Sequence, residues 1–246
     1  MELTGHVAIV TGASRGVGSA IADALEARGL VVARVARRSA RFTADVADPG
    51  EVDRLKAEVE AELGRPTVLV NAAGVFGPIA LIKDSDPAEW IETLMINAVG
   101  PYLVSRAFLG GLLDAGWGRI VNLSSAASLH TPGPLNSAYA TAKVALNRLT
   151  RHLAAELEGT GVTANVIHPG DVKTAMWADI RDKTAESVGK GSNYDKWVAW
   201  VEQTGGDPPE KAAKLVLDII ESDVNGRFLW IDDPLQTPIP SWGEDA

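Results

Sequence analysis

The chain has 246 residues, of which 46% are hydrophobic and 22% charged, and its formal net charge is −9. These proportions are ordinary for a globular protein, and the length suits one α/β domain formed by residues 1–246. The negative charge argues against a nucleic-acid partner. Because the chain contains no cysteine, disulfides, thiolate metal sites and cysteine nucleophiles are excluded. The four histidines lack the paired spacing of metal ligands, so we predict no metal.

The N-terminal residues lack the basic start and apolar core of a signal peptide. No uninterrupted apolar run approaches the roughly 18 residues that are needed to span a bilayer. We therefore predict a cytoplasmic protein that does not contact a membrane.

Short apolar runs alternate with longer segments of helical periodicity from the first residues onward. The pattern predicts strands at residues 6–10, 30–36, 67–70, 119–123, 162–167 and 227–231, with a weaker one at 41–44. It predicts helices at residues 16–28, 52–63, 89–113 and 137–157, and another that starts at residues 207–210. Apolar strands separated by helices indicate a parallel sheet covered on both faces. The sequence thus predicts an α/β fold with a Rossmann-type doubly wound sheet of about seven strands.

Two segments depart from this alternation. Residues 174–206 are polar, contain glycines and are rich in aromatic residues, which favours a mobile lid over a substrate. Trp197 and Trp200 within the lid could stack on an aromatic substrate or simply pack one helix face, and the sequence leaves both readings open. The tail, residues 234–246, contains three prolines and is predicted to be irregular.

The first predicted strand runs directly into a helix through the sequence Thr11-Gly-Ala-Ser-Arg-Gly-Val-Gly18. Glycines here permit a tight turn and a close approach of the backbone to a pyrophosphate, and the helix N-terminus offers free N–H groups to the phosphates. An ordinary turn between strand and helix is the alternative, but the position at the first strand favours a nucleotide site. The residues expected to bind it are Gly12, Ser14, Arg15, Gly16, Val17 and Gly18.

The second predicted strand indicates which nicotinamide cofactor binds. NAD-binding units place an acid at its end to hold the ribose 2′-hydroxyl, yet no Asp or Glu occurs between Glu26 and Asp45. Residues 34–41 of this stretch instead carry four arginines, Arg34, Arg37, Arg38 and Arg41. A guanidinium suits a 2′-phosphate, so we predict NADP(H), bound by Arg37 and Arg38 and within reach of Arg15. Arg34 lies in mid-strand and is the weakest candidate; a solvated basic loop is the alternative for all four.

Tyr139 and Lys143 stand four residues apart in a predicted helix and therefore share one face. A lysine cation beside a phenol lowers the pKa of the phenol, which can then pass a proton to a carbonyl oxygen. Such a pair is common on helix surfaces. Here, however, it follows a strand that ends in Asn122-Leu-Ser-Ser125, and hydroxyls at the carboxyl end of a strand lie where doubly wound sheets bind ligands.

Together these motifs resemble those of the short-chain dehydrogenase/reductase family, in its branch of about 250 residues. The matching pieces occur in family order: Thr11-Gly-x-x-x-Gly-x-Gly18, Asn71-Ala-Ala-Gly74, Asn97, Ser125, Tyr139-x-x-x-Lys143 and Pro169-Gly170. The resemblance implies four catalytic residues, with Tyr139 as the proton donor in reduction, Ser125 on the substrate oxygen, Lys143 on the nicotinamide ribose and Asn97 as the anchor of a water. Ser124 and Ser128 stay alternative hydroxyls.

The resemblance also implies further cofactor contacts. The adenine would meet Asp45 and Val46, and the adenine ribose would pass near Asn71, Ala72, Ala73 and Gly74. The nicotinamide amide and the phosphates would lie against Pro169, Gly170, Val172 and Thr174. Two features depart from the family pattern. Residues 38–43 are too few for the usual crossover helix, and Asp232-Asp233-Pro234 replaces a glycine-rich ending.

The predicted function is an NADP-dependent oxidoreductase that reduces a ketone or aldehyde to an alcohol, with a small molecule as its substrate. Three alternatives are an alcohol dehydrogenase run in the oxidative direction, a 3-oxoacyl-thioester reductase and a non-catalytic NADP-binding sensor. The full catalytic set argues against the sensor. The helices at residues 89–113 and 137–157 carry apolar residues on more than one face, and family members pair these helices across a two-fold axis. We therefore predict a homodimer or homotetramer.

Overall fold

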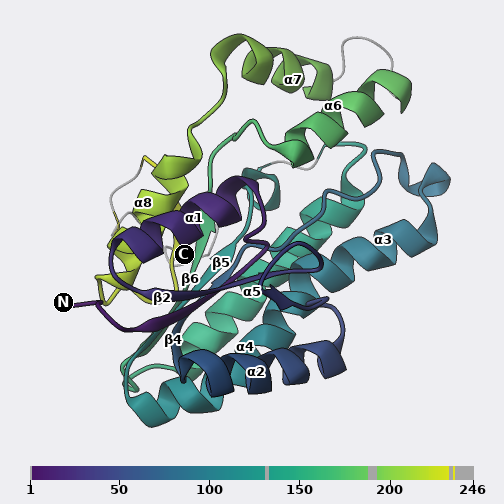
Figure 1. The fold of residues 1–246 in the computed structure, drawn as a ribbon. Helices are drawn as coiled ribbons and strands as arrows, with labels where there is room; N and C mark the ends of the chain where they lie inside the picture. The colour runs from purple at the N-terminus through teal and green to yellow at the C-terminus, as the bar shows by residue number, and fades with distance from the viewer. Residues whose placement is uncertain (1, 131–132, 188–192, 233–234, 236–246) are drawn as a thin grey trace.

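The computed structural model describes residues 2–130, 133–187, 193–232 and 235. Seven strands form one parallel sheet in the order β3-β2-β1-β4-β5-β6-β7 (Figure 1). They are β1 (Val7–Thr11), β2 (Val31–Ala36), β3 (Phe42–Thr43), β4 (Pro66–Asn71), β5 (Gly118–Leu123), β6 (Val162–His168) and β7 (Phe228–Trp230). This confirms the predicted doubly wound sheet. Its order reverses between β1 and β4, the switch point at which open α/β sheets bind ligands.

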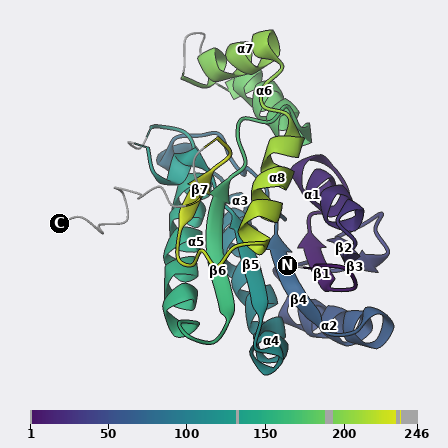
Figure 2. The ribbon, with the colours of Figure 1, turned by 90° about the vertical axis from the view of Figure 1, so that its left-hand side faces the viewer.

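Helices cover both faces of the sheet (Figures 1 and 2). On one side lie α1 (Gly16–Ala27) and α8 (Pro209–Ile220), and on the other α2 (Pro49–Leu63), α4 (Gly100–Ala115) and α5 (Ser137–Glu156). Successive side chains of a strand point to opposite faces, so Val7 and Ile9 join the core under α2, α4 and α5, whereas Ala8 and Val10 join the core under α1 and α8. The apolar character of both alternating sets explains why the strand pattern was readable in the sequence.

One long helical stretch runs from Pro87 to Ala115. It consists of α3 (Pro87–Leu94), a π-helical turn (Met95–Val99) and α4. Its 29 residues and a mean hydropathy of 1.2 would suit a membrane span by length and composition, but 61% of the apolar window is buried inside the fold. Because α4 packs on β4 and β5, most of these apolar residues belong to the core of the domain.

The connection from β2 to β3 is only five residues long, residues 37–41, and contains no helix. This agrees with the short spacing in the sequence. The predicted lid, residues 174–206, contains two helices, α6 (Ala175–Ser187) and α7 (Asn193–Thr204), which stand beyond the carboxyl ends of the strands (Figure 2). An antiparallel bridge between Val172 and Gly206 joins the two ends of this segment. The tail, residues 234–246, lies outside the described residues except for Leu235, which packs against the core under α1 and α8.

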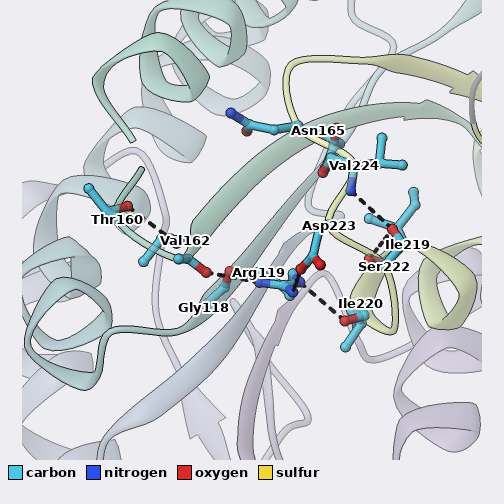
Figure 3. A network of polar contacts seen from close by, with 12 residues as sticks. Gly118, Arg119, Thr160, Val162, Asn165, Ile219, Ile220, Ser222, Asp223 and Val224 are labelled. Atoms are coloured by element: carbon cyan, nitrogen blue, oxygen red, sulfur yellow. Dashed lines mark hydrogen bonds and ion pairs between the residues drawn. The ribbon is translucent and has the colours of Figure 1, made fainter. Parts of the chain in front are cut away.

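A buried arginine joins the amino-terminal ends of β5 and β6 to the segment after α8 (Figure 3). Arg119 is 1% exposed and donates hydrogen bonds to the carbonyl oxygens of Gly118, Gly161 and Ile220. A further guanidinium nitrogen lies 2.8 Å from a carboxylate oxygen of Asp223. Buried charge is tolerated only when it is paired and hydrogen-bonded, and here the carbonyls and the carboxylate meet that need. The network lies at the amino-terminal ends of the strands. Ser125 and the glycine loop lie at the opposite, carboxyl-terminal ends.

Candidate active site

The loop between β1 and α1 brings its backbone very close to the neighbouring strand end. Gly12 has a φ of +69°, and a Cβ there would lie 2.8 Å from the carbonyl oxygen of Ala72. A Cβ on Gly18 would lie 2.4 Å from the carbonyl oxygen of Gly12. The Oγ1 of Thr11 accepts hydrogen bonds from the backbone N–H groups of Ala72 and Ala73, at 3.1 and 3.2 Å. Only glycine fits these positions, and the hydroxyl fixes the motif after β4 against the loop.

The N-terminus of α1 is open to an anion. Arg15 occupies the N-cap position in extended conformation without a side-chain capping bond, and the first turn holds no acidic residue. A cavity of about 440 Å³ lies beside it, lined by Arg15 and Gly16 on one side and by Lys173 and Thr174 on the other. Free N–H groups at a helix N-terminus attract phosphate. The residues present therefore fit the pyrophosphate of a dinucleotide.

Two of the four arginines considered for the 2′-phosphate, Arg34 and Arg41, form ion pairs with acids of neighbouring helices. Arg34 in β2 lies 2.5 Å from Asp23 and 2.7 Å from Glu26, two acids of α1. These carboxylates raise the pKa of Arg34 through their hydrogen bonds. Arg41 pairs with Glu62 of α2 at 2.5 Å. Arg34 thus connects β2 to α1, and Arg41 connects the segment before β3 to α2. This agrees with the prediction that Arg34 is the weakest candidate for binding the 2′-phosphate.

The other two arginines stand at the end of β2 with exposed side chains. Arg37 is 3.8 Å from Glu92, a long and solvent-exposed ion pair. Within the described chain, Arg38 and Arg15 make no ion pair. β2 is hydrogen-bonded directly to β1, whose end carries the glycine loop. Arg37 and Arg38 thus follow the strand that lies next to the glycine loop, and Arg15 belongs to that loop.

The segment that follows β3 is held in shape by its own carboxylates. A carboxylate oxygen of Asp45 accepts a hydrogen bond from the backbone N–H of Ala47 at 2.9 Å, and the backbone N–H of Asp45 donates to Glu51 at 2.7 Å. Val46 is buried, and a Cβ on Gly100 would lie 2.8 Å from it. Asp45 and Val46 therefore stand at a fixed position just beyond the ends of β2 and β3.

Ser125, Tyr139 and Lys143 meet where β5 ends against α5. Tyr139 is 8% exposed and Lys143 4%. The Ser125 side chain lies near enough to the Tyr139 phenol to lower the pKa of the phenol, and its Oγ accepts a hydrogen bond from the backbone N–H of Ala127 at 3.2 Å. The Nζ of Lys143 donates to the carbonyl oxygen of Leu123 at 2.7 Å and lies 5.5 Å from the centre of the Tyr139 ring.

The two alternative hydroxyls have other partners. Ser128 donates from its Oγ to the carbonyl oxygen of Ser125 at 2.6 Å and accepts from the Nδ2 of Asn147 at 2.8 Å. Ser124 is 3% exposed, and its Oγ lies 3.3 Å from that of Ser128. All three hydroxyls take part in the loop, and Ser125 is the one that also lowers the pKa of the Tyr139 phenol.

The pKa values of the pair differ from the expectation. Burial raises the pKa of Tyr139 to about 12, against a smaller lowering by the hydrogen bond with Ser125. Burial lowers the pKa of Lys143 to about 7. The prediction that Lys143 lowers the pKa of Tyr139 is therefore wrong for the protein alone. Desolvation disfavours both charged forms, and the ammonium group is directed to the Leu123 carbonyl.

Asn97 lies in the π-helical turn between α3 and α4, a distortion that is frequent at functional sites. Its Nδ2 donates to the carbonyl oxygens of Val75 and Thr93, at 2.8 Å each. Its Oδ1 is buried and has no hydrogen-bond partner among the residues that the structure describes. A Cβ on Gly74 would lie 2.7 Å from this Oδ1 and 3.8 Å from the Nζ of Lys143. Because Gly74 has no side chain, the Asn97 oxygen and the Lys143 ammonium face a common space.

The segment after β6 crosses from the sheet to the glycine loop. Pro169 follows the last residue of β6, and Gly170 has a φ of +85°. Val172 forms the bridge at the base of the lid. The methyl group of Thr174 would be 3.2 Å from a Cβ on Gly16. The four residues expected to cradle a nicotinamide thus line the path between β6 and α1.

Some residues of the site could not be singled out beforehand. Phe76, two residues after the Asn71-Ala-Ala-Gly74 motif, stacks on the Tyr139 ring. The Nδ1 of His168 accepts a hydrogen bond from the backbone N–H of Ala126 at 3.2 Å and so supports the serine loop. The only signal for either was its position at the carboxyl end of a predicted strand.

Comparisons with known proteins agree with this geometry. A family model described as short chain dehydrogenase matches residues 6–185. The 2,3-dihydro-2,3-dihydroxybenzoate dehydrogenase of Bacillus subtilis is 33% identical over 211 residues, which cover 77% of this chain and 79% of that protein. The 3-oxoacyl-[acyl-carrier-protein] reductase FabG of Pseudomonas aeruginosa is 33% identical over 206 residues, which cover 76% and 82%.

A solved structure of a variant of actinorhodin polyketide ketoreductase with NADPH superposes with a TM-score of 0.82 at 29% identity. The match covers 92% of this chain and 95% of that one. The sheet order, the glycine loop and the Tyr139–Lys143 pair thus occur together with similarity over most of the chain. The chain belongs to the short chain dehydrogenase family, whose members are oxidoreductases.

Proposed function

We propose that the protein reduces a ketone or an aldehyde to an alcohol with NADPH. The observation that carries this proposal is the buried Tyr139 phenol, which lies beside Ser125 and has the Nζ of Lys143 5.5 Å from its ring centre, at the carboxyl ends of the strands. A proton donor, a second hydroxyl and a cation at one point suit a reaction in which a carbonyl oxygen gains negative charge and then a proton.

NADPH supplies the hydride when it is bound. Ser125 donates a hydrogen bond to the substrate oxygen and so stabilises the charge that develops there. Tyr139 then gives its proton to that oxygen; its raised pKa ensures that the proton is present at neutral pH. Lys143 lies close enough to the ring to stabilise the phenolate that is left. Asn97 and the space beside Gly74 provide a place for water through which Tyr139 is reprotonated.

The preference for NADPH follows from the charges at the end of β2. Arg37, Arg38 and Arg15 are exposed cations, and the segment between Glu26 and Asp45 lacks the acid that would hold a ribose 2′-hydroxyl. The structure of the similar ketoreductase is described with NADPH. We expect the small-molecule substrate to enter under the lid of a single-domain subunit, and subunits to pair through α4 and α5.

A 3-oxoacyl-thioester reductase is the second candidate, favoured by the 33% identity to the FabG enzyme. Oxidation of an alcohol would use the same residues in reverse, so the supply of substrate and cofactor decides the direction. A sensor would need only the nucleotide pocket, and the completeness of the catalytic set argues against it. Consumption of NADPH with acetoacetyl thioester, diketones and aldehydes separates these functions.

The test of the proposal is the variant Tyr139→Phe, which removes the hydroxyl and keeps the ring. We expect the rate of NADPH oxidation with any accepted carbonyl to fall about 10²–10⁴-fold, while NADPH still quenches tryptophan fluorescence. Tyr102→Phe is the matched control, because Tyr102 is an exposed tyrosine of α4. A Tyr139→Phe enzyme as active as the Tyr102→Phe control would overturn the assignment.

A further inference from the structure

A layer of aromatic and aliphatic side chains covers the Tyr139 ring. Phe76 comes from the segment after β4, Leu135 precedes α5, and Met176, Ile180, Tyr194 and Trp197 come from the lid helices α6 and α7. These six residues pack together with Tyr139. A substrate that approaches the Tyr139 ring from this side would therefore meet these side chains.

The rings in this layer have a defined arrangement. Phe76 is stacked on Tyr139, with ring centres 4.7 Å apart and planes inclined by 29°. Tyr194 meets Phe76 edge-on, with centres 5.9 Å apart and planes at 85°. Aromatic faces and edges gain most from another flat π system or a rigid ring, beyond the gain from burial alone. A flexible chain would not use this geometry.

The layer also lacks charge. None of its described members is ionisable except the two tyrosines, and burial raises the pKa of Tyr194, as does the neighbouring Tyr139. A cation at the rim, Lys183 of α6, is already used: its Nζ donates to the carbonyl oxygen of Gly77 at 3.2 Å and pairs with Asp179 at 3.3 Å. Burying a carboxylate or phosphate among these side chains would cost several kcal/mol without a partner.

The two tryptophans of α7 separate in the structure. Trp197 packs against the layer, whereas Trp200, three residues later, is 46% exposed. The sequence left open whether this pair covers a substrate or only packs a helix. Trp197 meets the layer over Tyr139, and Trp200 provides a matched position outside it.

We infer that the substrate is an uncharged, flat ring ketone whose ring lies among Phe76, Tyr194 and Trp197 while its carbonyl oxygen reaches Tyr139. This inference rests on the proposed reductase function. It assigns substrate selection to three aromatic residues of the segment after β4 and of α7. The aromatic layer disfavours a thioester carried by an acyl carrier protein for two reasons. A long flexible chain gains nothing from stacking. Its phosphate-bearing arm also meets no free cation among the described residues of the layer.

The experiment compares NADPH-dependent reduction of 2-tetralone, which has fused rings, with that of octan-2-one, which is acyclic, and of 2-oxooctanoate, which is charged. We expect kcat/KM for 2-tetralone to exceed both others at least tenfold. Phe76→Leu and Trp197→Leu should each lower kcat/KM for 2-tetralone about two- to tenfold, as expected from the loss of one aromatic pair. The same variants should leave octan-2-one nearly unchanged, and Trp200→Leu should change neither.

Equal losses for 2-tetralone and octan-2-one in Phe76→Leu, or a preference for octan-2-one or 2-oxooctanoate, would overturn the ring inference while the reductase function stands. A second readout separates the two proposals: the thermal shift that 2-naphthol gives the enzyme–NADPH complex. If no ketone is reduced but 2-naphthol stabilises the wild type more than Phe76→Leu, the reductase function fails and the ring site stands. If 2-naphthol does not bind and no ketone is reduced, both fail.

Discussion

The Nζ of Lys143 lies 2.7 Å from the carbonyl oxygen of Leu123, and this hydrogen bond ties α5 to the end of β5. Ser125 follows two residues after that carbonyl, so one bond aligns the helix of Tyr139 with the loop of Ser125. It also leaves the lysine in a buried environment that lowers its pKa to about 7. Burial of the Lys143 ammonium group therefore lowers the free energy of unfolding by an amount that can be measured.

The first prediction concerns how stability depends on pH. The unfolded chain holds the lysine proton up to about pH 10.4, whereas folded Lys143 releases it near pH 7. Between these values the unfolded state binds more protons, so the lysine's contribution to the free energy of unfolding becomes more favourable as pH rises. The shift of Tyr139 acts only above about pH 10 and does not interfere.

Urea denaturation of the cofactor-free wild type and of Lys143→Met, at about pH 7 and about pH 9, isolates this contribution. We expect the stability of the wild type relative to the variant to increase by up to about 2 kcal/mol at the higher pH. A difference between the two proteins that stays constant across this range contradicts a lowered pKa.

The second prediction concerns the cofactor. Replacing Arg37 and Arg38 together by alanine should weaken NADPH binding tenfold or more, because each charge-assisted hydrogen bond contributes about 1.5–3 kcal/mol. NADH binding should change little. Arg41→Ala is the matched control, since that guanidinium is paired with Glu62. Fluorescence titrations give the dissociation constants. Wild-type enzyme that binds NADH as tightly as NADPH refutes the role of these arginines.

The features that could be read from the sequence are those set by neighbours along the chain. The continuous apolar run of β1 and the glycines at 12, 16 and 18 have local causes, namely burial on two faces and a backbone that only glycine allows. The shared face of Tyr139 and Lys143 follows from helix geometry alone. These signals were sufficient for the sheet and for the positions of the motifs.

Contacts between distant segments could not be read in this way. The stacking of Phe76 on Tyr139 joins residues 63 positions apart, and the two helices of the lid are stable through packing on that layer although their sequence is polar. The hydroxyl that faces Tyr139 was ambiguous, because the partner of Ser128 is Asn147 on another element. The pKa of Tyr139 depends on burial, which spacing does not report.

The third prediction concerns the buried arginine of Figure 3. Arg119→Met should lower the free energy of unfolding by about 3 kcal/mol, because buried carbonyls lose their donors. Arg119→Lys should also destabilise, since one ammonium cannot reproduce the planar fork. Asp223→Asn should cost less than about 1 kcal/mol, because the Asp223 side chain is 96% exposed. Denaturant titration measures the free energy of unfolding of the three variants. If Asp223→Asn lowers it as much as Arg119→Met does, the ion pair, rather than the hydrogen bonds to the carbonyls, stabilises the network.

The last prediction concerns assembly. Val144 of α5 is 50% exposed, and Tyr102 and Leu113 of α4 are 46% and 41% exposed, so both helices present apolar side chains to solvent. Burial of these faces against a second copy would remove them from water. We expect light scattering at micromolar concentration to give at least twice the mass of one chain, 25.9 kDa.

Val144→Glu should then dissociate the assembly. A two-fold axis through this face brings the introduced carboxylate of one subunit near the same carboxylate of the other subunit, and juxtaposed like charges in an interface cost several kcal/mol. Val31→Glu is the matched control: Val31 is 42% exposed but lies at the start of β2, away from both helices. Retention of the full mass by Val144→Glu would place the interface elsewhere. A wild-type mass of 25.9 kDa would mean that these apolar side chains face solvent and that each chain carries out its reaction alone.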